Sequence, residues 1–233
     1  MSGFSPNPDL SPFHLTTNFI NKNFRDPVSS ISHFIGAALS IIGLYLLLKK
    51  GLLIGNSHYI ISALVFGLSL IMLYTASGVY HMYNHAPEVI AILRRVDHMM
   101  IYVLIAGTYT PLCLLALSGW WGKGLLIAIW SLALIGIVLK LLFFNMPRIF
   151  STLLYIIMGW LAIIALVPLS RVLGIKGMTL LLGGGLFYTT GGIIYALKWP
   201  HINSNIWGFH EIFHIFILLG SLCHFFMIYI FVF

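Results

Sequence analysis

Seven long apolar runs limit what this chain can fold into. Each is close to the roughly 20 residues that a helix needs to cross the hydrocarbon core of a bilayer. They cover residues 27–48, 58–83, 94–117, 121–144, 149–169, 178–198 and 206–232. Backbone amides in lipid must be satisfied within a helix or a closed sheet, and these runs are continuous rather than alternating, so they predict helices. We therefore expect an all-α membrane protein, a single bundle of seven transmembrane helices.

The overall composition agrees with a membrane protein and argues against two other classes. Of the 233 residues, 60% are hydrophobic and only 7% are charged, against roughly 25% charged residues in a soluble domain. The net charge is +7, but the basic residues stand singly or in pairs near the ends of the runs, which is not typical of a nucleic-acid surface. Cys113 and Cys223 lie inside apolar runs and indicate neither a disulfide framework nor a cysteine-rich metal site.

The chain divides into a tail and one domain. Residues 1–25 are polar, include Pro6, Pro8 and Pro12, and lack the basic-then-apolar pattern of a cleavable signal peptide. Asp26-Pro27 fits a helix start, with Asp as the N-cap and Pro at the first helical position. We expect a short N-terminal tail over 1–25 and one membrane domain over 26–233.

The positive charges predict an orientation. With seven crossings, one side of the membrane holds seven basic residues: Lys22, Arg25, Arg94, Arg95, Lys140, Arg148 and Lys198. The other side holds five: Lys49, Lys50, Lys123, Arg171 and Lys176. The positive-inside rule then favours a cytoplasmic N-terminus. An odd number of crossings places the C-terminus outside.

The titratable residues gather on one side more strongly than the basic ones do. Seven crossings place four chemically active residues at the same membrane face: Asp26, His81, Asp97 and His210. Four of the five acidic residues lie at this face, and the fifth, Asp9, lies in the tail that leads to it. Of the ten histidines, only His58 lies at the opposite face, while His33 and His224 are deeper. One side of the bundle is therefore expected to hold nearly all of its titratable residues.

The last apolar run opens with a pattern that is typical of metal sites. His210 and His214 are four residues apart, so both imidazoles share one helix face. His-Glu-x-x-His is also the zincin pattern, in which two histidines bind zinc and the glutamate, here Glu211, acts as a general base. The pattern is short and occurs by chance, so a third ligand is needed to support it.

His81 can supply that ligand, although a histidine at a helix end is also typical of the membrane interface. Ser77 lies one turn before His81 and shares its face. Three histidines leave a fourth zinc position for water. Asp97 can orient or deprotonate that water, but it also fits a solvated helix start. Spacing alone does not choose between Asp97 and Glu211 as the base.

The first and last apolar runs carry further polar residues. Asp26, Ser29, Ser30 and His33 form one stripe along a helix, and a buried His33 would need hydrogen-bond partners. His224 lies roughly 15 Å deeper than the other histidines of its helix, so we expect a hydrogen-bonded structural role for it. The glycines at 183–185 and 191–192 predict close helix packing.

Taken together, the motifs resemble those of the bacterial hemolysin III proteins, within the progestin and adiponectin receptor (PAQR) family. The resemblance runs from Asp26 to about His224 and rests on these elements in this order: Asp26-Pro27-Val28-Ser29-Ser30-Ile31-Ser32-His33, Ser77-x-x-x-His81, Asp97-His98, Ala106-Gly107-Thr108-Tyr109-Thr110-Pro111 and His210-x-x-x-His214. It implies a seven-helix bundle in the bacterial cell membrane with a cytoplasmic N-terminus and a zinc ion near the cytoplasmic face.

The resemblance also implies roles for individual residues. The zinc ligands fall on His81, His210 and His214, and the catalytic pair falls on Asp97 and Ser77. From the residues themselves we expect Asp26, His33 and Glu211 in supporting positions around the ligands, with helix packing as a further possible role of Glu211. The chain departs from the family where Asp26 and Ser29 replace the usual Glu and Asn, and the shorter acid reaches about one methylene less far.

Three functions are compatible with these expectations. A similarity of the family to alkaline ceramidases favours a zinc-dependent hydrolase of lipid amides that affects membrane lipid homeostasis. A non-enzymatic sensor, in which zinc ties helices together, is the first alternative, and a cytolytic protein is the second. Membrane lipids are the expected partners, nucleic acid is not, and the sequence leaves the substrate and the oligomeric state open.

Overall fold

The computed structural model describes residues 24–143, 146–202 and 207–233, and these residues form an all-helical bundle without strands, as predicted. The α-helices are α2 (Pro27–Ile54), α3 (Ser57–Met82), α4 (Pro87–Pro111), α5 (Gly119–Leu142), α6 (Arg148–Trp160), α7 (Leu166–Leu197) and α8 (Phe209–Met227). Short π-helical turns extend α4 over Leu112–Ala116 and α8 over Ile228–Val232. All but the last two residues of the tail expected over 1–25 lie outside the described residues.

Six helical stretches of the described chain are long and apolar enough to cross a membrane. Five of them match single apolar runs of the sequence. The sixth is the 50-residue stretch Arg148–Leu197, which contains α6, a 3₁₀ segment over Leu161–Ala165, and α7. The chain is therefore an integral membrane protein, while the number of crossings depends on how this one stretch is placed.

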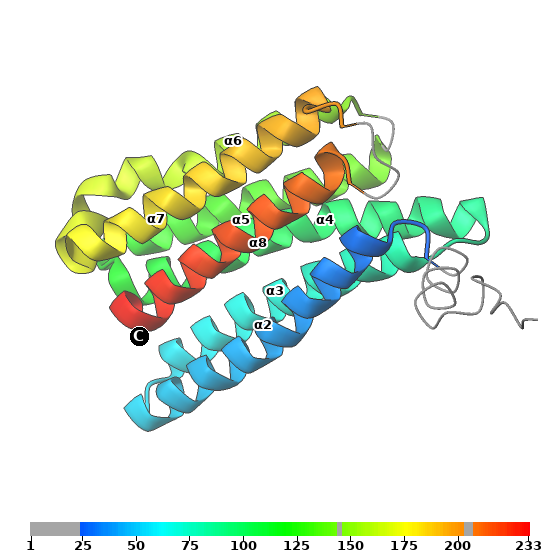
Figure 1. The fold of residues 1–233 in the computed structure, drawn as a ribbon. Coiled ribbons are helices and arrows are strands. Elements are labelled where there is room, and N and C mark those ends of the chain that lie inside the picture. Colours follow the sequence, from blue (N-terminus) through cyan, green and yellow to red (C-terminus); the bar gives the residue numbers. More distant parts are fainter. Residues whose placement is uncertain (1–23, 144–145, 203–206) are drawn as a thin grey trace, which may run out of the picture.

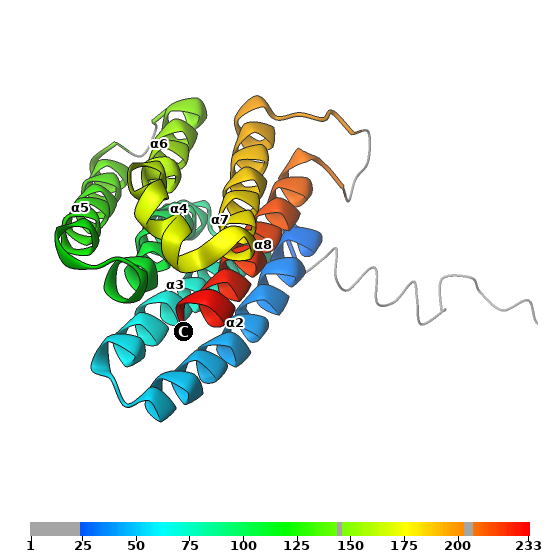
Figure 2. The same ribbon diagram turned by 90° about the vertical axis from the view of Figure 1, so that its left-hand side faces the viewer.

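The long stretch folds back on itself. Gly174 has φ 60° and ψ −174°, a left-handed conformation that glycine adopts more readily than other residues, and it interrupts α7. After this break α7 runs back along α6, since Trp160 donates its indole N–H to Thr189 at 2.9 Å and Thr152 packs against Gly192. Figure 2 shows the change of direction. Seven crossings require that this stretch cross the membrane twice. The number of crossings stays a prediction.

The helix ends that carry the candidate site residues meet at one end of the bundle. They are the start of α2, the end of α3 and the start of α8. α2 and α3 lie side by side and antiparallel, and the starts of α2 and α8 lie together in both views (Figures 1 and 2). The backbone N–H of Asp26 donates to the carbonyl of His81 at 3.0 Å, which joins the start of α2 to the end of α3. This connection places the predicted site residues of three helices next to one another.

Helix α4 begins earlier than its apolar run predicts. The expected start was residue 94, but the helix begins at Pro87, with Glu88 in its first turn. Proline is favoured at the first helical position because its missing N–H needs no partner there. Asp97 therefore lies almost three turns inside α4 and is buried, so the interpretation of Asp97 as part of a solvated helix start was wrong.

Helix α2 likewise extends past its apolar run. Its predicted end was residue 48, yet the helix continues through the lysine pair and ends at Ile54, where Gly55 adopts φ 74°. The ammonium of Lys50 donates to the backbone carbonyl of Tyr229 at 2.9 Å. Hydropathy marks the part of a helix that lies in lipid, whereas capping residues mark where the helix ends.

Small residues bring α7 and α8 together, as the glycine-rich segment predicted. A Cβ added at Gly184 would lie 2.5 Å from the His224 ring, and one at Gly191 would lie 2.9 Å from the Cβ of Phe216. At Gly183 a Cβ would meet nothing within 4 Å. Cys113 and Cys223 are both free thiols, also as expected.

Candidate metal centre

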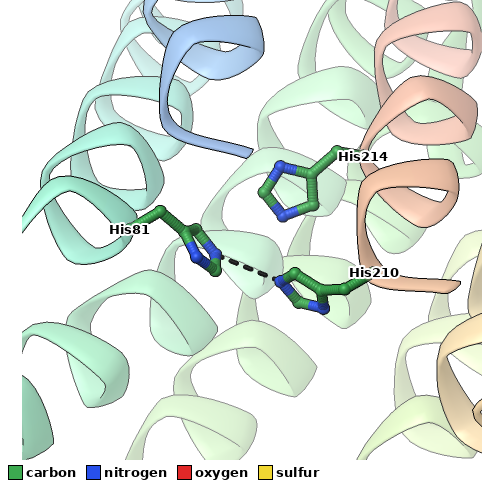
Figure 3. Close-up of side chains that lie close together, drawn as sticks. All are labelled: His81, His210 and His214. Carbon is green, nitrogen blue, oxygen red and sulfur yellow. Dashed lines mark hydrogen bonds between the residues drawn. The ribbon is translucent and has the colours of Figure 1, made fainter. Parts of the chain in front are cut away.

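Three histidines from two helices converge at the end of the bundle where α2 and α8 begin. His81 comes from the last turn of α3, and His210 and His214 come from the first turns of α8. One ring nitrogen from each lies within 4.8 Å of the others, and the Nε2 atoms of His81 and His210 are 3.1 Å apart. Figure 3 shows a ring nitrogen of His214 turned toward the gap between the other two. The arrangement brings together the residues that the sequence singled out as ligands.

Asp26 orients His81. Its Oδ2 atom lies 2.9 Å from Nδ1 of His81. An ionised carboxylate only accepts hydrogen bonds, so Nδ1 of His81 carries a proton, and Nε2 is the ring nitrogen left for a metal ion. This is the arrangement that holds metal-ligating histidines in other proteins. Nε2 of His81 therefore faces His210 as an available ligand atom.

The side chain of Asp26 does not cap α2, which corrects the capping role that we expected from Asp-Pro. Its carboxylate makes no capping hydrogen bond and instead accepts from His81 and from Nε of Arg25 at 3.0 Å. Burial by itself raises the pKa of Asp26, but the hydrogen bonds from His81 and Arg25 outweigh it and leave the pKa below its ordinary value. The carboxylate is ionised at neutral pH and reaches the histidine although it is one methylene shorter than glutamate.

His33 supports the cluster through its ring face. It is 3% exposed, and its ring stacks on that of His214 with centroids 3.7 Å apart. The ring of Tyr74 packs edge-on against its other side, 5.1 Å away. Neither ring nitrogen of His33 has a hydrogen-bond partner within the described part of the chain. His33 therefore contacts His214 by ring packing. The hydrogen bond that was expected from its place in the polar stripe of α2 is not the contact that holds it.

The hydrogen bonds of Glu211 do not favour it as a general base. One carboxylate oxygen accepts from the Ser29 hydroxyl at 2.9 Å. The other accepts from the backbone N–H of Gly208 at 2.8 Å, which completes a capping box at the start of α8. Both oxygens are therefore occupied in fixing α8 and in joining it to α2. Of the two roles left open for this residue, the structure favours the packing one.

Asp97 and Ser77 line a cavity that also reaches His210 and His214. Both side chains are buried, and the Asp97 carboxyl is close enough to interact with the Ser77 hydroxyl and with His81. The cavity has a volume of about 170 Å³, and His210 and His214 line the same space. Asp97 is thus an acidic residue that lines the same cavity as His210 and His214.

His224 lies apart from the three histidines. It is buried between α7 and α8, with Nε2 3.2 Å from the carbonyl oxygen of Leu181, and its ring packs against Tyr188. It is a hydrogen-bonded histidine outside the metal cluster, as predicted.

The sequence also matches known proteins. A family model described as haemolysin-III related matches residues 21–225. The chain belongs to the haemolysin-III related family. Hemolysin-3 of Bacillus cereus is 40% identical over 212 residues, which is 91% of this chain and 92% of that protein. A hemolysin-3 homolog of Bacillus subtilis (strain 168) is 42% identical over 200 residues, 86% of this chain and 91% of the relative.

More distant relatives of this haemolysin-III protein occur in animals. The human monocyte to macrophage differentiation factor is 24% identical over 173 residues, which is 72% of this chain and 69% of that protein. This similarity agrees with the wider progestin and adiponectin receptor grouping that the motifs predicted. The family assignment therefore confirms the resemblance drawn from the motifs.

The donor set of this haemolysin-III protein fits a zinc ion. Zinc binds imidazole nitrogens at about 2.0–2.1 Å, so two ligand nitrogens of a tetrahedral site lie roughly 3.3 Å apart. The 3.1 Å between His81 and His210 is close to that value, and His214 lies within 4.8 Å of both. Neutral imidazoles also suit other transition metals, so the residues fix the donor type rather than the element.

Three cavity-lining cations were missed by the sequence reasoning. Arg94, Lys140 and Arg148 served there only as indicators of membrane orientation, but all three line the cavity beside the histidines. The available signal was the lysine near the end of an apolar run, since a charge in such a position calls for a partner. The sequence does not show which helices surround Lys140.

Proposed function

We propose that this protein is a zinc-dependent hydrolase of lipid amides that acts within the bacterial cell membrane. The observation that carries the proposal is the three-histidine cluster beside a cavity that Asp97 and Ser77 also line. We further propose seven crossings with the N-terminus in the cytoplasm and the C-terminus outside. The site then lies near the cytoplasmic face.

His81, His210 and His214 would hold the metal ion. When bound, zinc acts as a Lewis acid that polarises a carbonyl group and acidifies water. Asp26 keeps His81 in the tautomer that offers Nε2 to the ion. Asp97 accepts the proton that water loses on attack and returns it to the leaving amine, while the Ser77 hydroxyl positions the carboxylate.

The rest of the cavity suits an acyl chain. Apolar side chains of α4, including Ile101, Leu104 and Ile105, line it beyond Asp97. An acyl chain against these residues would place the adjoining carbonyl near the histidines and exclude bulk water from the reaction. The polar groups at one end and the apolar wall at the other match an amphiphilic substrate.

The cavity also separates this function from the first alternative. A purely structural zinc site usually has four protein ligands and no open position. Here the described residues bring three candidate ligands together next to a cavity. This arrangement supports a catalytic zinc ion rather than one that only joins helices. No feature of the described structure favours the cytolytic alternative, so hydrolysis is the function that we put forward.

Two measurements on purified protein test the proposal. We expect about one equivalent of zinc in the wild type, and loss of that zinc in His81→Ala, because His81 comes from a different helix than its partners. We expect His210→Ala to abolish hydrolysis of a panel of lipid amides by the zinc-loaded protein. Unchanged turnover in His210→Ala would contradict a metal-dependent hydrolase.

His224→Ala is the matched control for both measurements. This histidine belongs to the same helix but bonds to a backbone carbonyl outside the cluster. We expect the variant to keep its zinc. If it lost zinc as completely as His81→Ala does, the loss would reflect damage to the bundle rather than removal of a ligand.

A further inference from the structure

Lys140 is a buried cation whose described partner is a neutral group. It lies in the last turn of α5 and is only 3% exposed. Its ammonium donates to the Ser151 hydroxyl of α6 at 2.6 Å. The ion pairs between described residues join Arg25 and His81 to Asp26, and none includes Lys140. Burying an ammonium without a counter-charge is costly, so this position calls for an anion.

The ammonium borders the same cavity as the histidine cluster. Arg148 also lines this cavity and is held there by Tyr195, whose ring lies 4.5 Å from the guanidinium carbon. Within the described residues, Asp97 is the one carboxylate that lines the cavity, and it interacts with Ser77 and His81. The cavity therefore has more positive than negative charge on its walls.

We propose that Lys140, together with Arg148, binds the phosphate group of a single-chain lipid in the cavity beside the three histidines. A phosphate monoester carries roughly 1.5 to 2 negative charges near pH 7 and has three acceptor oxygens. It can therefore accept from a lysine ammonium and an arginine guanidinium at once, and its charge offsets theirs. A neutral lipid head would leave the cationic wall uncompensated.

The shape of the cavity agrees with one acyl chain. Its wall changes from cationic at Lys140 and Arg148 to apolar along α4 at Leu104 and Ile105. Its volume of about 170 Å³ is below the roughly 300–1,000 Å³ of most small-molecule sites, so the cavity has room for part of one chain and none for a second. As a statement about the substrate, this proposal rests on the lipid hydrolase function proposed above, whereas binding itself requires no turnover.

The test measures binding to purified, detergent-solubilised protein by titration in native mass spectrometry. The probes are oleoyl lysophosphatidate and monooleoylglycerol, which differ only by the phosphate group, and inorganic phosphate as a competitor. We expect the wild type to prefer the lysophosphatidate by about tenfold or more, since a charge-assisted hydrogen bond contributes enough for that ratio. Inorganic phosphate should displace the lysophosphatidate and leave the binding of monooleoylglycerol unchanged.

Substitutions of Lys140 connect the preference to this residue. Lys140→Met should reduce the preference to less than about twofold, and Lys140→Arg should retain it because the positive charge stays. Lys123→Met is the matched control, since Lys123 is an exposed residue at the other end of the same helix and its removal changes the net charge equally. Thermal unfolding of each variant checks that the bundle is intact.

Several outcomes would overturn the proposal. Equal affinity of the wild type for the two lipids would do so, and so would an equal loss of preference in Lys123→Met, which would indicate a general charge effect. A preference that depends on Lys140 in protein that hydrolyses no lipid would support the phosphate site and contradict the hydrolase function. Hydrolysis of lipid amides without any preference for the phosphate-bearing lipid would support the hydrolase function and contradict the phosphate site.

Discussion

At the scale of single residues, the site depends on a hydrogen bond that joins the start of one helix to the end of another. The Asp26 carboxylate and Nδ1 of His81 are 2.9 Å apart, although they are separated by 55 positions in the sequence. The contact fixes the tautomer and the ring orientation of a candidate ligand. It also makes the negatively charged residue that precedes α2 part of the candidate metal centre.

Replacing Asp26 with Asn should weaken metal binding without preventing folding. The amide has the same size but no charge, so it holds His81 less firmly, and we expect zinc affinity to fall about 10- to 100-fold. Competition with a fluorescent zinc chelator measures this change. Glu211→Gln is the control, because Glu211 contacts Ser29 and Gly208, and its zinc affinity should stay within about threefold of the wild type. Equal losses in both variants would argue against a specific role for Asp26.

Replacing Asp97 with Asn should separate catalysis from metal binding. Asp97 faces the cavity and is not among the three clustered ligands, so zinc content should be unchanged. If Asp97 moves the proton, turnover of a lipid amide should fall about 10²- to 10⁴-fold. Metal analysis and a turnover assay on the same preparation check both expectations. Full activity in Asp97→Asn would exclude the carboxylate as the general base.

At the scale of elements, the helices are positioned by small residues as much as by apolar ones. α7 approaches α8 at Gly184, where a Cβ would lie 2.5 Å from the His224 ring. Small residues matter in membranes because burial away from water does not drive helices together there. The packing of α7 against α8 in turn keeps His210 and His214 in place.

Adding one methyl group at Gly184 should therefore destabilise the bundle. We expect Gly184→Ala to reduce the free energy of unfolding by about 1–3 kcal/mol through overpacking. Gly183→Ala is a matched control, since its Cβ would meet nothing within 4 Å and alanine favours a helix over glycine. Thermal unfolding in detergent compares the two. A similar loss of stability in both variants would show that helix packing at Gly184 is not the cause.

At the scale of the whole molecule, the candidate metal would join distant parts of the chain. The clustered histidines come from α3 and α8, and the contacts of Asp26 and Ser29 add α2 to the same end of the bundle. A ligand that binds only the folded state stabilises it by mass action. Metal binding should thus be measurable as global stability.

Removing the metal should lower the unfolding temperature. At a free zinc concentration of about 100 times the dissociation constant, binding contributes about 2.7 kcal/mol, which corresponds to roughly 5–10 °C for a chain of this size. Thermal unfolding with zinc and with a chelator measures the difference. His81→Ala should show no such difference, and an equal shift in that variant would indicate that the chelator acts elsewhere.

The proposed topology predicts which surface positions face the same side of the membrane. With seven crossings, Asn56→Cys and Lys176→Cys should be labelled from outside, while His85→Cys and His201→Cys should be protected in intact cells. All four native residues are exposed, and the labelling requires a background in which Cys113 and Cys223 are replaced. Labelling of Lys176→Cys from the same side as His201→Cys would show that Arg148–Leu197 does not cross twice.

The sequence by itself determined the class of fold and the candidate ligands. Continuous apolar runs allow only helices in lipid, and histidines in such runs are too costly to be incidental, so both could be predicted from residue type and spacing. Helical periodicity placed His210 and His214 on one helix face, and the family resemblance supported both as ligands. His81 was predicted because successive membrane-crossing helices alternate in direction. This alternation places the end of its helix on the same side of the membrane as His210.

Only the tertiary structure decided how these residues meet. Contacts between helices depend on packing at positions such as Gly184, and no periodicity along one helix reports which residue of another lies opposite. That is why the pairing of Asp26 with His81, the contact of Glu211 with Ser29 and the burial of Lys140 beside the cavity were not predictable. The sequence determines which polar groups enter the membrane, and the packing of the helices determines which partner each group has there.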